Sequence, residues 1–329
     1  MPTTTPSVPI DIHKSTIHKT TKPQPPHFTP HPLPLTHIMH TFPASELIIN
    51  PDGSIFHLHL LPEQLADKVI LCGDPGRVTT IAQHFDTREC EVESREFHTV
   101  TGTFQGKRIS AVSTGIGCDN CDIVINELDA LKNIDFPTRT LKAQLTSLDI
   151  VRIGTCGGLQ PYTPIGTFIC TEKSIGFDGL LNFYDGRDQV CDLDMEQAFT
   201  RHMNWSPRLP APYVIDNNPS LLDQLYEPQI GMVKGMTIAA PGFFGPQGRR
   251  LRIPLADPDQ NSKVESFEHR GHRITNFEME SSAIAGLSAL LGHRALTVCM
   301  VIANRLAQQA NANYKNQIDD LIIHVLNRL

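Results

Sequence analysis

The amino-acid sequence predicts an α/β fold with a mixed central β-sheet and α-helices on both of its faces. After residue 44, apolar segments typical of strands alternate with segments whose apolar residues recur at helical spacing. Such alternation is typical of a sheet covered by helices on both sides. Glycine-rich turns follow three of the expected strands, as in folds that bind a ligand where strand ends converge.

Each expected strand is a short run rich in β-branched or other apolar residues and bounded by turn-forming residues. The first follows the turn Asn50–Gly53, and the second, Val69–Cys72, is wholly apolar and ends at a glycine. The remaining strands repeat this pattern. In chain order, the expected strands are residues 55–58, 69–72, 96–103, 108–113, 150–153, 167–174, 232–239, 272–276 and 295–302.

The expected helices carry apolar residues at intervals of three and four. The helix over residues 280–291 is apolar on most faces, so we expect it in the core. Residues 207–219 and 254–259 contain turn-forming prolines and are expected to be surface loops. In chain order, the expected helices are residues 77–84, 120–132, 195–202, 220–225, 280–291 and 314–329.

Composition excludes several classes of protein. The chain has 329 residues, 40% of them hydrophobic, which is enough for one large domain or two small ones. A net charge of −7 leaves no basic footprint, so we expect no nucleic-acid partner. Charged residues interrupt the longest apolar stretch, which argues against a membrane partner. Eight scattered cysteines without a preceding secretory signal indicate reduced thiols and a cytoplasmic location.

Residues 1–43 differ in kind from the rest. They hold ten of the 25 prolines and six of the 15 histidines, and they show no apolar periodicity. Such a segment cannot bury enough apolar surface to offset the entropy of ordering it. The irregular spacing of the histidines favours a solvated tail over a metal site. We therefore expect a disordered tail over residues 1–43 and a single domain over residues 44–329.

The segment Gly73-Asp74-Pro75-Gly76-Arg77 is a candidate anion-binding loop. It joins the apolar strand 69–72 to a helix. Glycine lets backbone N–H groups approach an anion, and a helix N-terminus adds a favourable dipole. Arg77 adds a planar set of donors that matches phosphate oxygens.

A second candidate patch, Asn276–Ser281, surrounds Met279 with the carboxylates Glu278 and Glu280. Carboxylates accept hydrogen bonds from sugar hydroxyls, and a thioether packs on the apolar face of a sugar ring. A phosphate loop together with such a patch indicates chemistry between phosphate and a ribose.

Two further strands run into small-residue turns, Ser113–Gly117 and Arg152–Gly158. If the strand ends meet at one crevice, Arg152 and Arg77 can bind one phosphate, with Thr155 as a neutral donor. Either arginine taken alone is equally consistent with an ordinary surface ion pair.

Cys118 and Cys121 form an isolated CxxC pair. A zinc site needs two more ligands at suitable spacing, and no such pair follows nearby in the sequence. We expect semi-buried thiols here and no metal site. A serine-nucleophile motif of the Gly-x-Ser-x-Gly type is also absent from the sequence.

These motifs, in this order, resemble the nucleoside phosphorylase family, and most closely its uridine phosphorylases. The matching segments cover nearly all of the chain after residue 50. They are FHLHL (56–60), GDPGRV (73–78), REF (95–97), STGIG (113–117), RIGTCGGLQP (152–161), FFGPQGR (243–249), NFEMES (276–281) and VIANR (301–305).

The resemblance implies a mixed central β-sheet partly closed as a barrel and flanked by α-helices. It implies that Gly73, Arg77, Arg152 and Thr155 bind phosphate. It also implies a homo-oligomer, at least a dimer and up to a hexamer, with sites shared between subunits. Arg95 is then expected to reach the phosphate of a neighbouring subunit.

The resemblance also implies which residues contact the nucleoside. His57 is expected to touch the partner's ribose, while Met279 and Glu280 hold the ribose of their own site. Phe243 is expected to lie over the base. The last two implied residues, Gln247 and Arg249, would bind the edge of a pyrimidine.

Substrate choice depends on Gln247 and Arg249. A departing pyrimidine carries negative charge that Arg249 can stabilise, while the amide of Gln247 both donates and accepts. Purine-specific relatives instead place an Asp in the strand that matches residues 298–305, where this chain has Ile302-Ala303-Asn304. Gln247 and Arg249 are also consistent with an ordinary polar loop.

The sequence departs from the family pattern at Phe244-Gly245-Pro246, where Tyr-Pro-Gly is usual, and at residues 118–121, where small residues are usual. Apparent insertions cover residues 133–148, 182–212 and 251–263.

We therefore expect phosphorolysis of uridine to uracil and ribose 1-phosphate, with Arg249, Gln247 and Glu280 as the catalytic residues. Inorganic phosphate would be the co-substrate, and no cofactor is expected. The alternatives are a purine nucleoside phosphorylase, a nucleosidase that uses water, and a non-catalytic nucleoside-binding protein. The three arginines Arg77, Arg95 and Arg152 favour phosphate over water.

Overall fold

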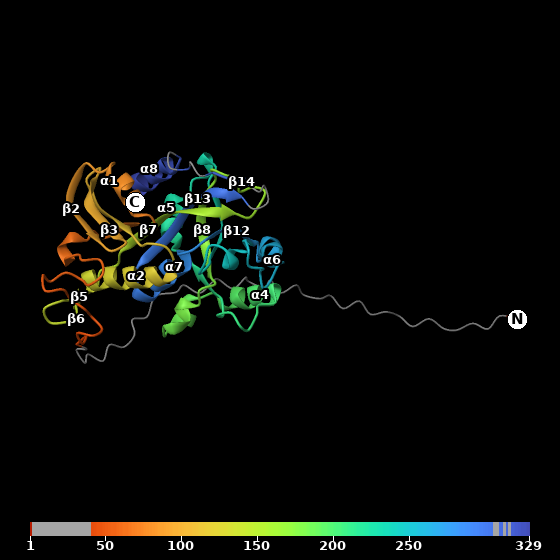
Figure 1. The fold of residues 1–329 in the computed structure, drawn as a ribbon, viewed down its shortest axis with the longest axis horizontal. Coiled ribbons are helices and arrows are strands. Elements are labelled where there is room, and N and C mark those ends of the chain that lie inside the picture. Colours follow the sequence, from red (N-terminus) through yellow and green to blue (C-terminus); the bar gives the residue numbers. More distant parts are fainter. Residues whose placement is uncertain (2–40, 305–308, 312–313, 315–316) are drawn as a thin grey trace. The chain divides into compact units, whose positions relative to one another are not determined.

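The fold was determined as a computed structural model that describes residues 1, 41–304, 309–311, 314 and 317–329 (Figure 1). The expected tail over residues 1–43 therefore lies almost wholly outside the described residues, as does Arg305. Within the described part, Phe42 packs against the core, and its backbone N–H donates to the carbonyl of Arg139 at 2.9 Å.

Twelve of the strands that the structure describes form one mixed sheet. Its main path runs β11-β12-β10-β8-β13-β7-β1-β4-β3-β2, with β9 beside β8 and β14 beside β13. The strands of this sheet are β1 (Lys68–Cys72), β2 (Thr87–Ser94), β3 (Phe97–Phe104), β4 (Lys107–Ser113), β7 (Asp149–Gly158), β8 (Phe168–Gly176), β9 (Tyr213–Asp216), β10 (Val233–Ala239), β11 (Glu268–His269), β12 (His272–Glu278), β13 (Arg294–Asn304) and β14 (Gln309–Ala310). A separate hairpin pairs β5 (Ile134–Asp135) with β6 (Thr140–Leu141).

Five strands of the sheet close into a barrel, because β7 pairs with β12 as well as with β13. The β7–β12 pairing is antiparallel and sets Phe277 opposite Gly157. Around the ring, β7 and β13 are parallel, β13 and β8 antiparallel, and β8, β10 and β12 parallel. The expected mixed sheet, partly closed as a barrel, is confirmed.

Helices cover both faces of the sheet. They are α1 (Pro75–Ala82), α2 (Cys118–Asn133), α3 (Arg187–Val190), α4 (Leu193–Met203), α5 (Pro219–Leu225), α6 (Gln260–Ser266), α7 (Ser281–Leu291) and α8 (Ile318–Arg328). Among the helices in this described part of the chain, none is long and apolar enough to cross a membrane.

Strand β1 shows how the two faces are built. Its alternate residues Val69 and Leu71 belong to the apolar cluster that contains α2 and α7. Ile70 and Cys72 point to the cluster that contains α1, α5 and α8, on the other side of the sheet in Figure 1. Successive strand residues face opposite sides, so a wholly apolar strand requires cover on both. A third cluster joins β8, β10 and β12 to α4 and α6.

Two local predictions were wrong. Residues 55–58 form a turn rather than a strand, because the carboxylate of Glu127 accepts the backbone N–H groups of His57 and Leu58. Residues 207–219 are not entirely surface loop, since β9 lies within them and Tyr213 is fully buried. The sequence analysis also missed β2, whose alternate polar residues face solvent at the end of the sheet path.

Candidate functional site

The glycine-rich loop after β1 lies against the turn that follows β4. Strand β1 is parallel to both β4 and β7, so the carboxyl ends of all three strands lie at one edge of the sheet. A Cβ atom on Gly73 would lie 3.1 Å from the carbonyl oxygen of Gly115, so the two backbones approach closely. Asp74 caps α1 by accepting the N–H of Gly76 at 2.9 Å, and Pro75 begins the helix.

Arg77 and Arg152, the expected phosphate residues, come together at this edge. Arg77 lies in the first turn of α1, is buried, and its Nη1 donates to the carbonyl of Ile153 at 3.2 Å. Ile153 follows Arg152 in β7, and Thr155 lies half-buried two residues further along the same strand. The structure thus brings Gly73, Arg77, Arg152 and Thr155 onto adjacent elements.

Arg152 is only 4% exposed and is held by both carboxylates of the second patch. Its Nη1 lies 3.1 Å from Glu278 Oε2, and its Nη2 donates to Glu280 Oε2. Glu280 also accepts the backbone N–H of Gly117, from the turn before α2, at 2.8 Å. A Cβ atom on Gly154 would lie 2.0 Å from Arg152 Nη1, so this position has no room for a side chain unless the guanidinium moves.

Glu278 also organises the start of α7. It accepts the backbone N–H of Glu280 at 2.9 Å and both the N–H and the hydroxyl of Ser281. Burial raises the pKa of Glu278, and the charge of Arg152 acts against that rise. Burial acts to lower the pKa of Arg152, but the two carboxylates hold it well above its ordinary value. The guanidinium is therefore charged.

The three base-site candidates form a compact group in the loop after β10. Arg249 Nη1 donates to Gln247 Oε1 at 2.5 Å and to the carbonyl of Phe243 at 2.6 Å. Its Cζ atom lies 3.7 Å from the centre of the Phe243 ring, within cation–π range. Gln247 is only 2% exposed, whereas Phe243 is 51% exposed.

The unusual Phe244-Gly245-Pro246 sequence forms a short 3₁₀ turn over Gly245–Gln247. The carbonyl of Phe244 accepts the N–H groups of Gln247 and Arg249, at 3.1 and 2.8 Å, and so closes the turn. Gln247 and Arg249 therefore lie together, although the sequence before them departs from the family pattern.

The loop that carries the three base-site candidates starts next to Glu278. Strand β10 is parallel to β12 with Ala239 opposite Glu278, and the N–H of Ala240 donates to the Glu278 carbonyl at 3.0 Å. Met279 lies half-buried between the two glutamates, and its carbonyl accepts a hydrogen bond from the Cys118 thiol at 3.2 Å.

His57 and Arg95 form a separate group. His57 Nδ1 lies 2.6 Å from Glu127 Oε1 on α2, and the guanidinium of Arg95 lies 5.5 Å from the centre of the Phe56 ring. Arg95 is exposed in the turn between β2 and β3 and has a positive φ of 56°. Among the described residues, no hydrogen bond or ion pair joins His57 or Arg95 to Arg77 or the other phosphate candidates.

Three contributors to these groups were missed in the sequence analysis. Glu278 was noted there as a carboxylate but was given no role toward Arg152. Gly117 and Glu127 act through long-range contacts that no local pattern signals. Cys118 and Cys121 are both buried, and burial raises the pKa of each thiol well above its ordinary value.

Two surface hollows lie away from these groups. One, of about 540 Å³, lies over α4 and the loop that follows it, and the other, of about 600 Å³, lies between the loop after β7 and α6. None of the candidate residues lines either hollow. The assignment of the site therefore rests on its side-chain chemistry.

Comparison with known proteins identifies the family. Residues 67–328 match the family model described as the phosphorylase superfamily. The chain belongs to this superfamily. Its members include the nucleoside phosphorylases that the sequence motifs resemble, so the resemblance is confirmed, and the chain is an enzyme of the pentosyltransferase type.

Individual relatives carry both pyrimidine and purine names. Uridine phosphorylase of Thermococcus kodakarensis is 27% identical over 82% of this chain and 84% of its own. Uridine phosphorylase of Escherichia coli is 26% identical over 83% of this chain and 96% of its own. The purine nucleoside phosphorylase DeoD-type of Geobacillus stearothermophilus is 27% identical over 74% of this chain and 85% of its own.

A solved structure shows the same fold. The nucleoside phosphorylase of Trypanosoma brucei, described as showing uridine phosphorylase activity, superposes with a TM-score of 0.74. It is 26% identical, and the match covers 86% of this chain and all of the other.

The first prediction concerns the carboxylate that joins Arg152 to the turn before α2. Replacing Glu280→Gln removes the charge and leaves an amide in its place. A hydrogen bond to a charged group contributes about 1.5–3 kcal/mol, so nucleoside cleavage should fall about ten- to a hundredfold. The measurement is kcat/KM with the best nucleoside substrate.

The matched control is Glu268→Gln, which breaks an exposed Glu–Arg pair with Arg273 on the neighbouring strand. Thermal unfolding of both variants separates loss of chemistry from loss of fold. A folded Glu280→Gln enzyme with more than half of the wild-type activity would show that this carboxylate has no role in the reaction.

Proposed function

We propose that this enzyme is a uridine phosphorylase, which converts uridine and inorganic phosphate to uracil and ribose 1-phosphate. The observation that carries the proposal is the preformed group of Gln247, Arg249 and Phe243. A buried amide with its oxygen toward a guanidinium, beside an exposed aromatic ring, matches a planar pyrimidine that leaves as an anion.

The electrostatics of the leaving group favour this assignment. When the glycosidic bond breaks, its electron pair stays on the base, and the charge spreads over N1 and the two carbonyl oxygens of uracil. Arg249 stabilises that charge as it develops. The hydrogen bond from Arg249 orients Gln247 before substrate arrives, which reduces the reorganisation needed in the transition state.

The residues at the end of β13 argue against a purine. Purine-specific relatives would need an acidic side chain there, and this chain has Ile302 and Ala303. Asn304 is buried, and its amide donates to the carbonyl of Thr163 at 2.8 Å. Purine phosphorolysis stays the second candidate, because a purine phosphorylase is also among the relatives.

Phosphate is the proposed nucleophile because the strand ends at the candidate site carry more cationic and hydrogen-bond donors than a water molecule requires. Arg77 and Arg152 approach from α1 and β7, with the backbone of Gly73 and the hydroxyl of Thr155 at the adjacent strand ends. A phosphate oxygen forms the new bond to C1′ while the bond to the base breaks. The transition state then resembles an oxocarbenium ion, as in other glycosyl transfers.

The protein supplies no covalent nucleophile in this scheme. Glu280 and Met279 orient the ribose, the arginines hold phosphate, and Arg249 stabilises the departing base. Phosphate is the only small molecule proposed besides the nucleoside, so no cofactor takes part.

A shared active site accounts for the separate group of His57 and Arg95. We propose that the enzyme is a homo-oligomer in which these two residues complete the site of a neighbouring subunit. Glu127 holds the His57 ring from α2, and the turn between β2 and β3 presents Arg95 to solvent. This placement suits residues that act across an interface.

The second prediction concerns the base. Cleavage of uridine with phosphate should exceed cleavage of inosine by at least about tenfold, the scale of one good hydrogen bond in the transition state. Replacing Arg249→Met should lower kcat for uridine by about a hundredfold, because one charge-stabilising donor is lost. An absorbance assay with uridine and inosine, each with and without phosphate, measures both effects.

The control for this experiment is Arg250→Met, which removes the same charge from the exposed neighbouring residue. It should leave activity unchanged. If inosine is cleaved as fast as uridine, the pyrimidine assignment is wrong and the purine alternative replaces it.

The third prediction tests the shared site. Arg77→Ala and Arg95→Ala proteins should each be nearly inactive alone. When the two are co-expressed, one site of each mixed dimer receives Arg77 from its own chain and Arg95 from the neighbour. Mixed dimers, isolated with two different affinity tags, should therefore recover part of the wild-type activity.

The matched control mixes Arg77→Ala with Arg152→Ala. Both arginines belong to the same chain's site in this account, so every site of that mixture lacks one of them and activity should not return. Verified Arg77→Ala/Arg95→Ala dimers without activity would exclude a role of Arg95 across the interface.

A further inference from the structure

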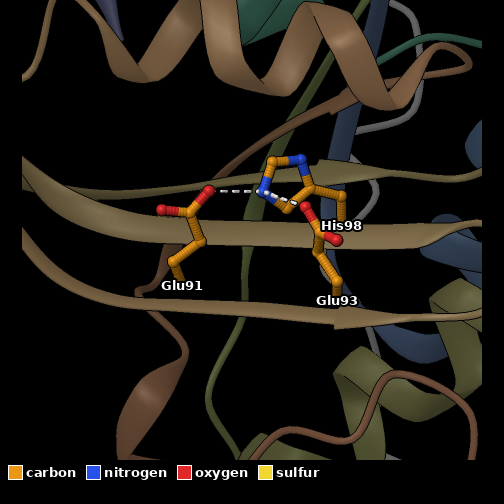
Figure 2. A group of neighbouring side chains, drawn as sticks. All are labelled: Glu91, Glu93 and His98. Atoms are coloured by element: carbon orange, nitrogen blue, oxygen red, sulfur yellow. Dashed lines mark hydrogen bonds and ion pairs between the residues drawn. The ribbon is translucent and has the colours of Figure 1, made fainter.

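Three side chains outside the proposed active site meet on one face of the β2–β3 hairpin. Glu91 and Glu93 lie two residues apart on β2, so they point to the same face of the strand. His98 lies on β3 directly opposite Glu93. Figure 2 shows the imidazole between the two carboxylates, and one donor atom from each of the three residues lies within 4.8 Å of the others.

The two ring nitrogens of His98 have different neighbours. The residue is only 5% exposed, and its Nδ1 lies 3.3 Å from the carbonyl oxygen of Pro75. A carbonyl oxygen only accepts, so this contact favours the tautomer with the proton on Nδ1. In the neutral ring, Nε2 then presents its lone pair to Glu91 Oε1 at 2.9 Å and Glu93 Oε1 at 3.8 Å.

A lone pair that faces two carboxylates is unfavourable unless Nε2 is protonated or a metal cation lies between them. Histidines that bind metals typically donate their second ring N–H to a backbone carbonyl or carboxylate, as His98 does to Pro75. Ligands about 2.0–2.2 Å from a metal lie roughly 3–3.5 Å apart at near-tetrahedral angles. The two separations of His98 from the carboxylates, 2.9 and 3.8 Å, lie on either side of that range.

We propose that Glu91, Glu93 and His98 bind a divalent transition metal of the zinc class. One imidazole with two carboxylates suits Zn²⁺ and its neighbours, whereas Mg²⁺ and Ca²⁺ prefer oxygen ligands throughout. Three protein ligands leave a further position for water. The sequence analysis expected no metal site, because it considered only the cysteines and the tail histidines.

The location gives the site a structural consequence. His98 connects the hairpin to Pro75, the first residue of α1, and the same hairpin carries Arg95 in its turn. A metal held by both strands stabilises the hairpin that presents Arg95. Metal binding by the folded chain does not depend on which substrate the enzyme takes.

The test is a Zn²⁺ titration of the metal-free, full-length protein by isothermal calorimetry. The variant is Glu93→Gln, a residue whose side chain is 75% exposed, so the substitution preserves the fold. The control is Glu89→Gln, which removes the same charge from the same strand but from a residue paired with Arg108. All three proteins keep the histidines of residues 1–40, so binding by that segment cancels in the comparison.

Wild type and Glu89→Gln should each bind one equivalent of Zn²⁺ at this site. Glu93→Gln should bind it at least about tenfold more weakly, because even loss of an outer-shell partner weakens a metal site by about ten- to a hundredfold. His98→Gln should behave like Glu93→Gln. Replacing Zn²⁺ with Mg²⁺ should abolish the difference.

An ion pair between a protonated His98 and Glu91 is the competing explanation for the 2.9 Å contact. It predicts the same Zn²⁺ binding in wild type, Glu93→Gln and His98→Gln. That result, or an equal loss of affinity in the Glu89→Gln control, would overturn the proposed site.

Discussion

Arg152 is a buried cation that must be paired, because an unpaired charge inside a protein costs several kcal/mol. Its partners, Glu278 and Glu280, come from the end of β12 and the start of α7, and Glu280 also holds the turn before α2. The β7–β12 pairing that closes the barrel brings the strand of Arg152 beside the strand that ends at Glu278. The same contacts therefore stabilise both the candidate site and the barrel. A change in one is expected to disturb the other.

The charges around Arg152 support the proposal that a second subunit completes the site. Within one chain, Arg152 is already paired with both carboxylates, and Arg77 donates to the carbonyl of Ile153. The single charge of Arg77 does not balance an incoming phosphate dianion. We infer that Arg95 from the neighbouring subunit supplies the second positive charge, while the sugar hydroxyls bind the carboxylates. The proposed oligomer would then serve the electrostatics of the reaction.

The sequence predicted those features that local patterns encode. Alternating strands and helices gave the fold class, and glycine at a strand end located the loop Gly73–Arg77. Barrel closure depends on the pairing of β7 with β12 across more than a hundred residues, which only the family resemblance implied. The turn at residues 55–58 was missed because a distant carboxylate, Glu127, outweighs local β-propensity. The roles of His57 and Arg95 require a second copy of the chain, so neither sequence patterns nor one chain's contacts can establish them.

The central claim is that phosphate, and not water, attacks the nucleoside beside Arg77 and Arg152. The most direct measurement is ³¹P nuclear magnetic resonance of the enzyme with uridine and inorganic phosphate. The account predicts that a phosphate monoester signal from ribose 1-phosphate grows as inorganic phosphate declines, in equal amount to the uracil released. Release of uracil and free ribose with an unchanged phosphate signal would contradict it and identify a hydrolase on the same fold.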